Sequence, residues 1–404
     1  MTEGKTIGNV NILDLRKTTE ETIASIRKVG NVNIILYSPE TSSFLARLDI
    51  GNVNSSVEVP ANAKLQTTMG NVLLSPDSLR TAEGPMFHLI MGNATIDTQS
   101  GEAAVSEELE DVAGLIIMGN VICPESLSGV IEPKIKQLMG NFTTYPDDAM
   151  LVAGSLDLTI GFLERMEKPC RLVVTGSVRV LEDVSEAVER KIEYLQVGSG
   201  VICSEANADA IRSKLQGGAS RLIVIPDGYR FHEGDLTLDA AAVGSLSQAK
   251  LFCTGKVILK TDIDPATVGP AIDGLRALGL ILCPAGLKDE LQSKLDFVED
   301  RILFYEGDLW LFDDEHQLHA SRFEYSEGKA TALVIGELTI EPDVAPDVLA
   351  NRFHAIHNLG EIRCTPEQMG AIEARLGVHE GDLLDSTPKE KEKYDIGNAN
   401  VLTL

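Results

Sequence analysis

The chain has 404 residues, 44% of them hydrophobic, and a formal net charge of −26. The length would suit two or three ordinary domains, and the hydrophobic content is enough for a continuous core. The charge argues against nucleic acid as a partner, because a protein that binds a phosphate backbone needs clustered Lys and Arg. It argues equally against an anionic membrane, and we expect it to keep an extended body dispersed in water.

The sequence also bears on location. The first residues carry neither the basic region nor the apolar region of a secretion signal. No run approaches the ~18 apolar residues that a membrane-spanning helix needs. Six cysteines in a chain of this length do not make a disulfide scaffold. We therefore expect a cytoplasmic protein.

From residue 1 to residue 117 the chain repeats a short, strand-dominated motif. An Ile, Val or Met is followed by Gly-Asn and usually Val, and successive glycines lie 19 to 27 residues apart. A fixed period in the twenties is typical of a solenoid. Modest helices are expected between the strands, at 20–28 and 42–48. We interpret the asparagines as a structural ladder in which each side chain serves its neighbour's amide; they are Asn9, Asn31, Asn52, Asn71, Asn93, Asn120 and Asn141.

A longer repeat of about 80 residues covers 118–386. Apolar spacing predicts helices at 131–138, 208–215, 287–295 and 369–376, and second helices at 182–195, 264–278 and 343–356. Cysteines recur at intervals of 80, 80 and 81 residues, as Cys123, Cys203, Cys283 and Cys364. If adjacent coils stack ~4.8 Å apart, successive cysteines lie ~14 to 19 Å apart along the stack, too far for a disulfide or a shared metal. We expect them to fill one apolar core position.

Strands that return every 20 to 29 residues with a helix or turn between them must run parallel. The crossover rule makes their winding right-handed. The predicted fold is therefore an α/β repeat solenoid of right-handed parallel β coils, with helices between strands mainly after residue 118. We expect about seventeen or eighteen coils in one continuous stack ~80 Å long. A charged tether and a terminal strand would follow at 387–404.

One stretch resembles a known repeat family. Residues 275–283 read Leu-x-x-Leu-x-Leu-x-x-Cys and resemble a leucine-rich repeat of the cysteine-bearing kind; residues 115–123 resemble it more loosely. This resemblance implies a curved parallel sheet on one side, helices on the other, and binding across the concave strands. The Gly-Asn pair departs from a leucine-rich pattern, and the first third of the chain is more similar to a narrow β-helix of the bactofilin type.

Polar clusters give only weak candidates for chemistry. His354 and His357 would share a face of a helix, but a zinc site needs a third ligand. Asp313 and Asp314 begin the densest polar cluster of the C-terminal half, which reads first as a solvated loop and second as a divalent-ion or catalytic loop. Gly-Asp-Leu recurrences place three aspartates at equivalent coil positions, several coils apart and beyond the ~5 to 9.5 Å of a glycosidase pair; they are Asp235, Asp308 and Asp382. We predict no catalytic residue, cofactor or metal.

Both ends of the chain carry the same apolar strand, at 7–13 and 396–402, without a recognisable cap. Solenoids normally finish with polar caps. The end residues Val10, Ile12, Val401 and Leu402 either pair with a second copy, as a dimer or a head-to-tail polymer, or fold back to cap the chain's own core. We predict a non-catalytic repeat scaffold that binds a protein partner or itself through its ends. The alternative is a carbohydrate-active enzyme on a parallel β-helix.

Overall fold

The computed structural model describes residues 4–80, 86–96, 102–216, 221–295, 301–386 and 395–404. The chain forms two compact units: unit 1 contains residues 1–224 and 390–404, and unit 2 contains residues 225–389. The tether expected at 387–394 lies outside the described residues.

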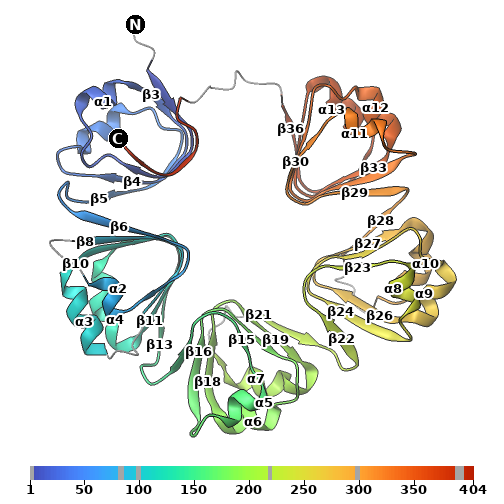
Figure 1. Ribbon diagram of the computed structural model, residues 1–404, viewed down its shortest axis with the longest axis horizontal. Coiled ribbons are helices and arrows are strands. Elements are labelled where there is room, and N and C mark those ends of the chain that lie inside the picture. The colour runs from blue at the N-terminus through green and yellow to red at the C-terminus, as the bar shows by residue number, and fades with distance from the viewer. Residues whose placement is uncertain (1–3, 81–85, 97–101, 217–220, 296–300, 387–394) are drawn as a thin grey trace. The chain divides into compact units, whose positions relative to one another are not determined.

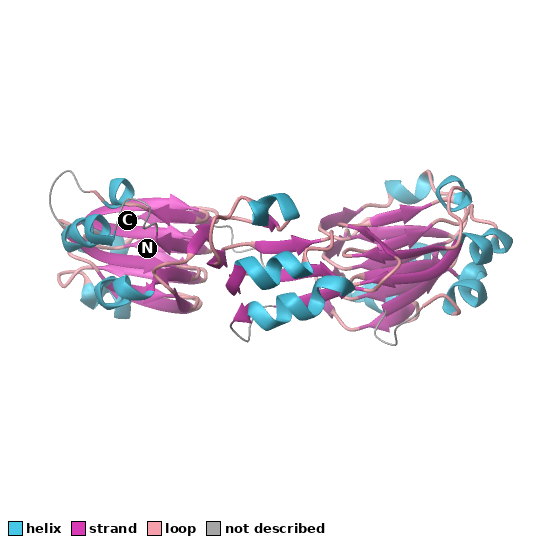
Figure 2. Cartoon of the chain, turned by 90° about the horizontal axis from the view of Figure 1, so that it is seen from below, coloured by secondary structure: helices cyan, strands magenta, loops and turns pink. Residues whose placement is uncertain are grey.

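One turn of the chain follows a constant plan. β16 (Cys170–Val174) enters a first sheet, β17 (Ser177–Val180) enters a second sheet after a short corner, and α6 (Ser185–Lys191) closes the turn. The next turn places its strands parallel to these. Figure 2 shows the strands lying above one another with helices along one side. We call a set of turns that share the same two sheets a stack, and the ten sheets of the described chain make five stacks.

Unit 1 holds three stacks (Figure 1). Stack 1 contains β1 (Lys5–Ile7), β2 (Val10–Asp14), α1 (Glu20–Ala24), β3 (Ile26–Val29), β4 (Val32–Tyr37), the 3-10 helix Ser42–Arg47, β5 (Val53–Glu58) and the C-terminal β37 (Ala399–Thr403). Stack 2 contains β6 (Lys64–Met69), β7 (Val72–Leu74), α2 (Pro76–Leu79), β8 (Met86–Met91), β9 (Ala94–Ile96), α3 (Glu102–Asp111), β10 (Val112–Ile117), β11 (Val121–Pro124), α4 (Glu125–Ile131), β12 (Ile135–Leu138) and β13 (Phe142–Tyr145). Stack 3 contains, besides the turn above, β14 (Met150–Val152), β15 (Leu156–Asp157), α5 (Ile160–Glu164), β18 (Ile192–Val197), β19 (Gly200–Ser204), α7 (Ala208–Lys214), β20 (Leu215–Gln216) and β21 (Arg221–Ile225).

Unit 2 holds the other two stacks. Stack 4 contains β22 (Tyr229–His232), β23 (Leu236–Leu238), α8 (Ala240–Gly244), β24 (Ala249–Cys253), β25 (Val257–Leu259), α9 (Pro265–Ala271), β26 (Ile272–Ala277), β27 (Leu280–Pro284), α10 (Lys288–Gln292) and β28 (Arg301–Tyr305). Stack 5 contains β29 (Asp308–Phe312), β30 (Glu315–Leu318), α11 (Ser321–Glu324), β31 (Ala330–Val334), β32 (Glu337–Ile340), α12 (Pro346–Arg352), β33 (Phe353–Asn358), β34 (Glu361–Cys364), α13 (Pro366–Glu373), β35 (Leu376–His379) and β36 (Asp382–Asp385).

The predicted parallel pairing is confirmed, but the single continuous stack is wrong. Sheets of the described chain contain at most four strands, and each stack encloses its own cluster of buried apolar side chains. The boundary expected after residue 117 falls inside stack 2, because β10 pairs with both β8 and β12 across it.

A stack ends where a turn lacks its helix. After β13 and β28 the chain passes within a few residues to β14 and β29, which start a new first sheet. Without a helix along the third side, the chain cannot return to the first sheet that it left. Tyr145 and Tyr305 finish these last strands, and their hydroxyls donate to the carbonyls of Ile96 (3.0 Å) and Leu259 (2.5 Å).

Stacks within a unit pack sheet against sheet. In unit 1 a second buried cluster joins Ile34 and Val57 of stack 1 to Phe87 and Leu89 of stack 2. In unit 2 a corresponding cluster joins Leu282 of stack 4 to the first sheet of stack 5. The outward faces of these strands are therefore apolar as well as the inward ones.

Several predicted helices are too long at their C-terminal ends. The structure has shorter helices, α6, α9 and α12, within the ranges expected at 182–195, 264–278 and 343–356. The strands β18, β26 and β33 follow them directly. The helix expected at 131–138 is misplaced, because α4 already ends at Ile131, a 3-10 helix covers Glu132–Lys134 and residues 135–138 form β12. Each of these strands has a register shift at its start, so that one residue is skipped in the pairing. This irregularity spaces inward residues three apart, as in Ile192 and Leu195, which imitates a helical period.

His88 is a buried polar side chain in β8. It is only 3% exposed, and its Nε2 has no hydrogen-bond partner among the described residues. Burial lowers the pKa of His88, because the charged imidazolium would lose its hydration.

We expect this histidine to make the protein acid-sensitive. Its folded pKa lies below its unfolded value of about 6.5, so its stabilising effect is full above that pH and is lost as the pH falls toward the folded pKa. Urea unfolding at pH 7.5 and 5.5, followed by circular dichroism, should show a smaller loss for His88→Leu than for the unmodified chain. The exposed His319→Leu serves as the control, and equal losses in both variants would contradict the prediction.

Candidate functional site

The C-terminal strand completes the first stack. β37 lies beside β2 as the edge strand of the sheet ordered β37-β2-β4-β5, and Figure 1 shows this red strand against the blue N-terminal ones. Val10 pairs with Ala399, Ile12 with Val401 and Leu13 with Leu402. Of the two alternatives for the chain ends, the structure has the fold-back. β37 therefore caps the N-terminal coil, and the expectation that this coil is uncapped is wrong.

The pairing follows from repeated sequence. Asn398 Oδ1 accepts from the Asn9 backbone N–H (2.9 Å), and Asn9 Oδ1 accepts from that of Asn31 (2.8 Å). Asn52 Nδ2 then donates to Asn31 Oδ1 (3.0 Å). A second ladder runs beside the first, with Nδ2-to-Oδ1 distances of 2.7 to 2.9 Å, through Asn400, Asn11, Asn33 and Asn54. Together the two ladders line a shallow hollow of about 460 Å³.

Glycine is required beside this ladder. A Cβ on Gly8 would lie 2.7 Å from Asn398 Oδ1 and 3.0 Å from the carbonyl carbon of Gly397. The close approach of two backbones at this corner explains the glycine at position 8, whereas a Cβ on Gly397, at the edge of the sheet, would meet no atom within 4 Å.

Side-chain hydrogen bonds hold the residues on either side of β37 to the N-terminal coil. Asp395 Oδ2 accepts from the Thr6 backbone N–H (2.8 Å) and from the Thr6 hydroxyl (3.2 Å). The backbone donor lowers the pKa of Asp395 below its ordinary value. At the other end the Thr18 hydroxyl donates to the Leu404 carbonyl (2.6 Å).

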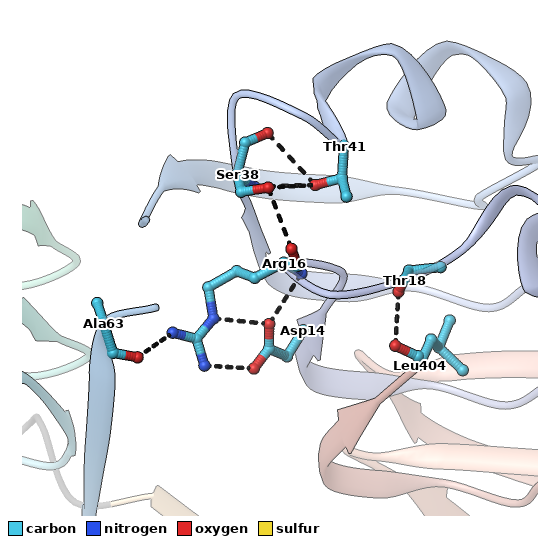
Figure 3. A network of polar contacts seen from close by, with 7 residues as sticks. All are labelled: Asp14, Arg16, Thr18, Ser38, Thr41, Ala63 and Leu404. Atoms are coloured by element: carbon cyan, nitrogen blue, oxygen red, sulfur yellow. Dashed lines mark hydrogen bonds and ion pairs between the residues drawn. The ribbon is translucent and has the colours of Figure 1, made fainter. Parts of the chain in front are cut away.

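A buried ion pair lies next to this terminal contact (Figure 3). Arg16 donates through Nε to Asp14 Oδ1 (2.9 Å) and through Nη2 to Asp14 Oδ2 (2.8 Å), and its Nη1 donates to the Ala63 carbonyl (2.9 Å). The two side chains are only 8% and 7% exposed. Ser38 donates to the Arg16 carbonyl (3.1 Å). One guanidinium therefore joins the end of β2 to the segment that opens stack 2.

The contact of β37 is shallow in comparison with the rest of the stack. Val401 is 39% exposed, while Leu402 and Leu404 are partly buried against the core of stack 1. No strand of the described chain pairs with its outer edge. Backbone hydrogen bonds and amide ladders, rather than deep burial, hold this strand.

The other predicted asparagines form a separate ladder in stack 2. Each side-chain oxygen accepts the next backbone N–H, at 2.7 to 3.1 Å, along Asn71, Asn93, Asn120 and Asn141. The ladder does not continue from Asn52 to Asn71, because stack 1 ends at β5. In stack 3 the corresponding corner uses Ser155 and Ser177, and in stack 4 Asp235 accepts from the Lys256 N–H (2.7 Å).

The four repeat cysteines are fully buried, each in the core of a different stack. The distances expected along one stack therefore do not apply; separation into different cores keeps these thiols apart. All six cysteines are free. Burial raises the pKa of Cys123 and Cys283 to about 12, and that of Cys203 and Cys364 to about 11.

We expect these four thiols to be inert in the folded protein, since the thiolate is the reactive form. Ellman's reagent at pH 8 should modify them only after urea is added, with Cys170, which is half-buried, reacting first. Tryptic mapping of the labelled cysteines assigns the order. Rapid native labelling of Cys123 or Cys283 would show that the cores open readily.

The weak metal candidates do not come together. His354 and His357 lie on β33, not on a helix: His354 Nδ1 lies 3.5 Å from Glu306, and His357 Nδ1 accepts from the Val378 N–H. Asp313 pairs with Lys256 Nζ (3.4 Å), which also contacts Asp235. Within the described residues there is no group of three or more His, Cys, Asp or Glu placed to hold a metal.

The aspartates of the three Gly-Asp-Leu sequences were expected at equivalent coil positions, and this prediction is wrong. Asp308 begins β29 in a first sheet, whereas Asp235 precedes β23 and Asp382 begins β36 in second sheets. The leucine-rich pattern at 275–283 likewise spans β26 and β27, which belong to two sheets.

Searches with the chain found no matching protein-family model, no matching curated protein and no matching solved structure. None of the helices in the described part of the chain combines the length and the apolar character that crossing a membrane requires.

Proposed function

We propose that the chain is a non-catalytic repeat scaffold of the solenoid class that assembles with copies of itself by exchanging its C-terminal strand. In the closed chain β37 occupies the edge of its own β2. In an assembled form β37 of one copy occupies the edge of β2 in the next, which gives a dimer or a head-to-tail polymer.

One observation carries this proposal: β37 repeats the sequence pattern of the strand on which it docks, in register, and its contacts all lie within stack 1. A second copy offers the same backbone groups and the same asparagines. Strand exchange therefore keeps the contacts and changes only which chain supplies them, so the balance depends on effective concentration.

The shallow burial of β37 supports exchange over permanent closure. An edge strand held mainly by main-chain pairing can leave without opening a core, and strand addition to a sheet edge is a common mode of recognition. We also keep the cytoplasm as the proposed location, which the six free cysteines support.

Light scattering after size-exclusion chromatography tests the proposal. The full chain should show an oligomer fraction that grows with protein concentration, and a variant lacking 395–404 should lose it. Mixing that variant with a synthetic peptide of residues 395–404 should give a complex, while a peptide carrying Asn398→Ala and Asn400→Ala should bind more weakly. A full chain that stays monomeric at every concentration, or oligomers that persist in the truncated variant, would overturn strand exchange.

A further inference from the structure

A second feature of unit 1 is unrelated to the chain ends. A hollow of about 310 Å³ lies between the second sheet of stack 2 and the first sheet of stack 3. Strand β11 supplies Ile122, β13 supplies Thr143 and Thr144, and Asn141 lies just before β13. From the facing sheet, β16 supplies Val173, and β18 supplies Tyr194 and Gln196. Gln216 of β20 closes the row, since it pairs with Gln196.

The same place is filled with aliphatic side chains elsewhere in the fold. Between stacks 4 and 5, Leu282 and Leu303 of the second sheet pack in one cluster with Leu311 and Leu333 of the first. Thr143 takes the place of Leu303 on the fourth strand of its sheet. A polar residue where stack 4 packs a partly buried leucine loses apolar contact, and such departures from the local rule concentrate at functional sites.

A corresponding difference lies on the facing strand. Tyr194 and Gln196 of β18 take the places of Ala355 and His357 of β33, because both strands are third in their sheets and begin with the same register shift. The large phenol ring and the amide thus stand at positions occupied in stack 5 by a methyl group and an imidazole. The residues that line the hollow therefore differ from their counterparts in stacks 4 and 5 on both of the facing sheets.

The polar groups in the hollow are arranged by contacts across it. The Tyr194 hydroxyl donates to Gln196 Oε1 (2.6 Å), and Gln196 Nε2 donates to the Thr144 carbonyl (3.3 Å). The Gln196 amide is therefore held between the two stacks. Within the described part of the chain, the side chains of Asn141, Thr143 and Gln216 make no hydrogen bond and remain available to a ligand.

The lining is uncharged. Its described residues are amides, hydroxyls, one phenol ring, a glycine and the aliphatic residues of a floor, with no Asp, Glu, Lys or Arg. Amides offer both donors and acceptors to hydroxyl groups, and an aromatic ring with aliphatic neighbours accepts the apolar face of a ring. A charged ligand would find no counter-charge in this hollow, and a wholly apolar one would leave the amides unpaired.

We propose that this hollow binds a neutral sugar, of one or two pyranose rings, with Gln196, Asn141 and Thr143 hydrogen-bonded to its hydroxyls and Tyr194 against a ring face. Glycoside cleavage requires a pair of carboxylates, and the described lining supplies none, so the site binds without cleaving. The proposal does not depend on strand exchange.

Isothermal titration of the full chain with glucose, galactose, maltose, cellobiose and lactose tests it. At least one of these probes should bind with a single site per chain. Thr143→Leu, which restores the residue of stack 4, should weaken that binding at least ~10-fold, equal to about 1.4 kcal/mol, and should leave the melting temperature unchanged or higher. Because Thr143 is exposed, this variant is not expected to impair folding.

Gln196→Leu provides a second, independent variant, and Gln317→Leu, an exposed glutamine of stack 5, is the matched control that should bind as the unmodified chain does. The proposal fails if no probe gives a saturable heat, or if Thr143→Leu and Gln196→Leu bind the sugar as tightly as the control.

Discussion

Replacing Arg16 by alanine should lower the free energy of unfolding of stack 1 by about 3–5 kcal/mol. The substitution removes three side-chain hydrogen bonds: the Asp14 carboxylate loses the guanidinium and keeps the Arg16 backbone N–H, and the Ala63 carbonyl loses its Arg16 donor. An uncompensated buried charge is the costliest outcome of breaking such a pair, much costlier than losing both partners together.

The measurement can separate the two units. The only tryptophan of the chain, Trp310, lies in stack 5 of unit 2, so its fluorescence reports that unit, whereas far-ultraviolet circular dichroism reports both. Arg16→Ala should bring part of the circular dichroism transition to lower urea and leave the Trp310 transition in place. A shift of both transitions together would show that the units unfold as one.

Two controls make this test specific. The double variant Asp14→Leu with Arg16→Met keeps the volume without the charge and should cost much less than the single change. Arg212→Ala removes an exposed pair with Asp209, whose side chain is 98% exposed, and should change the stability by less than ~0.5 kcal/mol. A cost for Arg16→Ala as small as that of Arg212→Ala would contradict the structural role of the buried pair.

Deleting residues 395–404 should loosen stack 1 without unfolding stack 2. The deletion bares the edge of β2 and removes the partners of Thr6, Asn9 and Thr18. We expect the amides of β2 and β1 to exchange with deuterium at least ~100-fold faster, which corresponds to ~2.7 kcal/mol of opening free energy. Amides of β8 and β10 should keep their protection, because they pair within stack 2.

The 395–404 peptide should restore this protection when added in excess, which ties the loss to the missing strand rather than to general damage. The peptide with Asn398→Ala and Asn400→Ala, which lacks both ladder residues, is the matched control. Unchanged exchange in the truncated chain would mean that β37 contributes nothing to the stability of its stack.

Much of the fold could be predicted from the sequence, because short motifs such as Gly-Asn recur at the spacing of the coils. The Gly-Asn corners require close backbone approach, and strands separated by helices must run parallel. The helix ends were wrong for a definable reason: in Ile192 to Val197 a register shift puts inward residues three apart, and a spacing of three does not distinguish a bulged strand from a helix.

The sequence pattern did not predict the division into stacks, because a stack ends where a turn of the chain has no helix. The residues between Tyr145 and Met150, Pro146-Asp147-Asp148-Ala149, form a tight turn where the other turns of the stack have a helix, and that omission moves the chain to a new sheet. A repeat that keeps its period while it changes its stack looks continuous in sequence.

The candidate site was only half visible. Repetition of 7–13 in 396–402 identified the end strands, but the repeated sequence fits pairing within one chain and pairing between two chains equally. The pair of Asp14 and Arg16 could not be distinguished from the many surface charges, since its burial comes from Ala63 and stack 2.

The side-by-side position of β2 and β37 has a consequence for engineering. Because β37 runs parallel to β2, residue 404 lies beside Asp14, at the C-terminal end of β2. A flexible linker from residue 404 to residue 4 must therefore span the third side of the coil, as residues 15–25 do between β2 and β3, and the backbone can then be cut elsewhere. The helix-free link between β13 and β14 is a suitable place for new ends, since it separates complete stacks. Such a circular permutant would carry its own edge strand covalently in place, so that closure would no longer depend on a free tail.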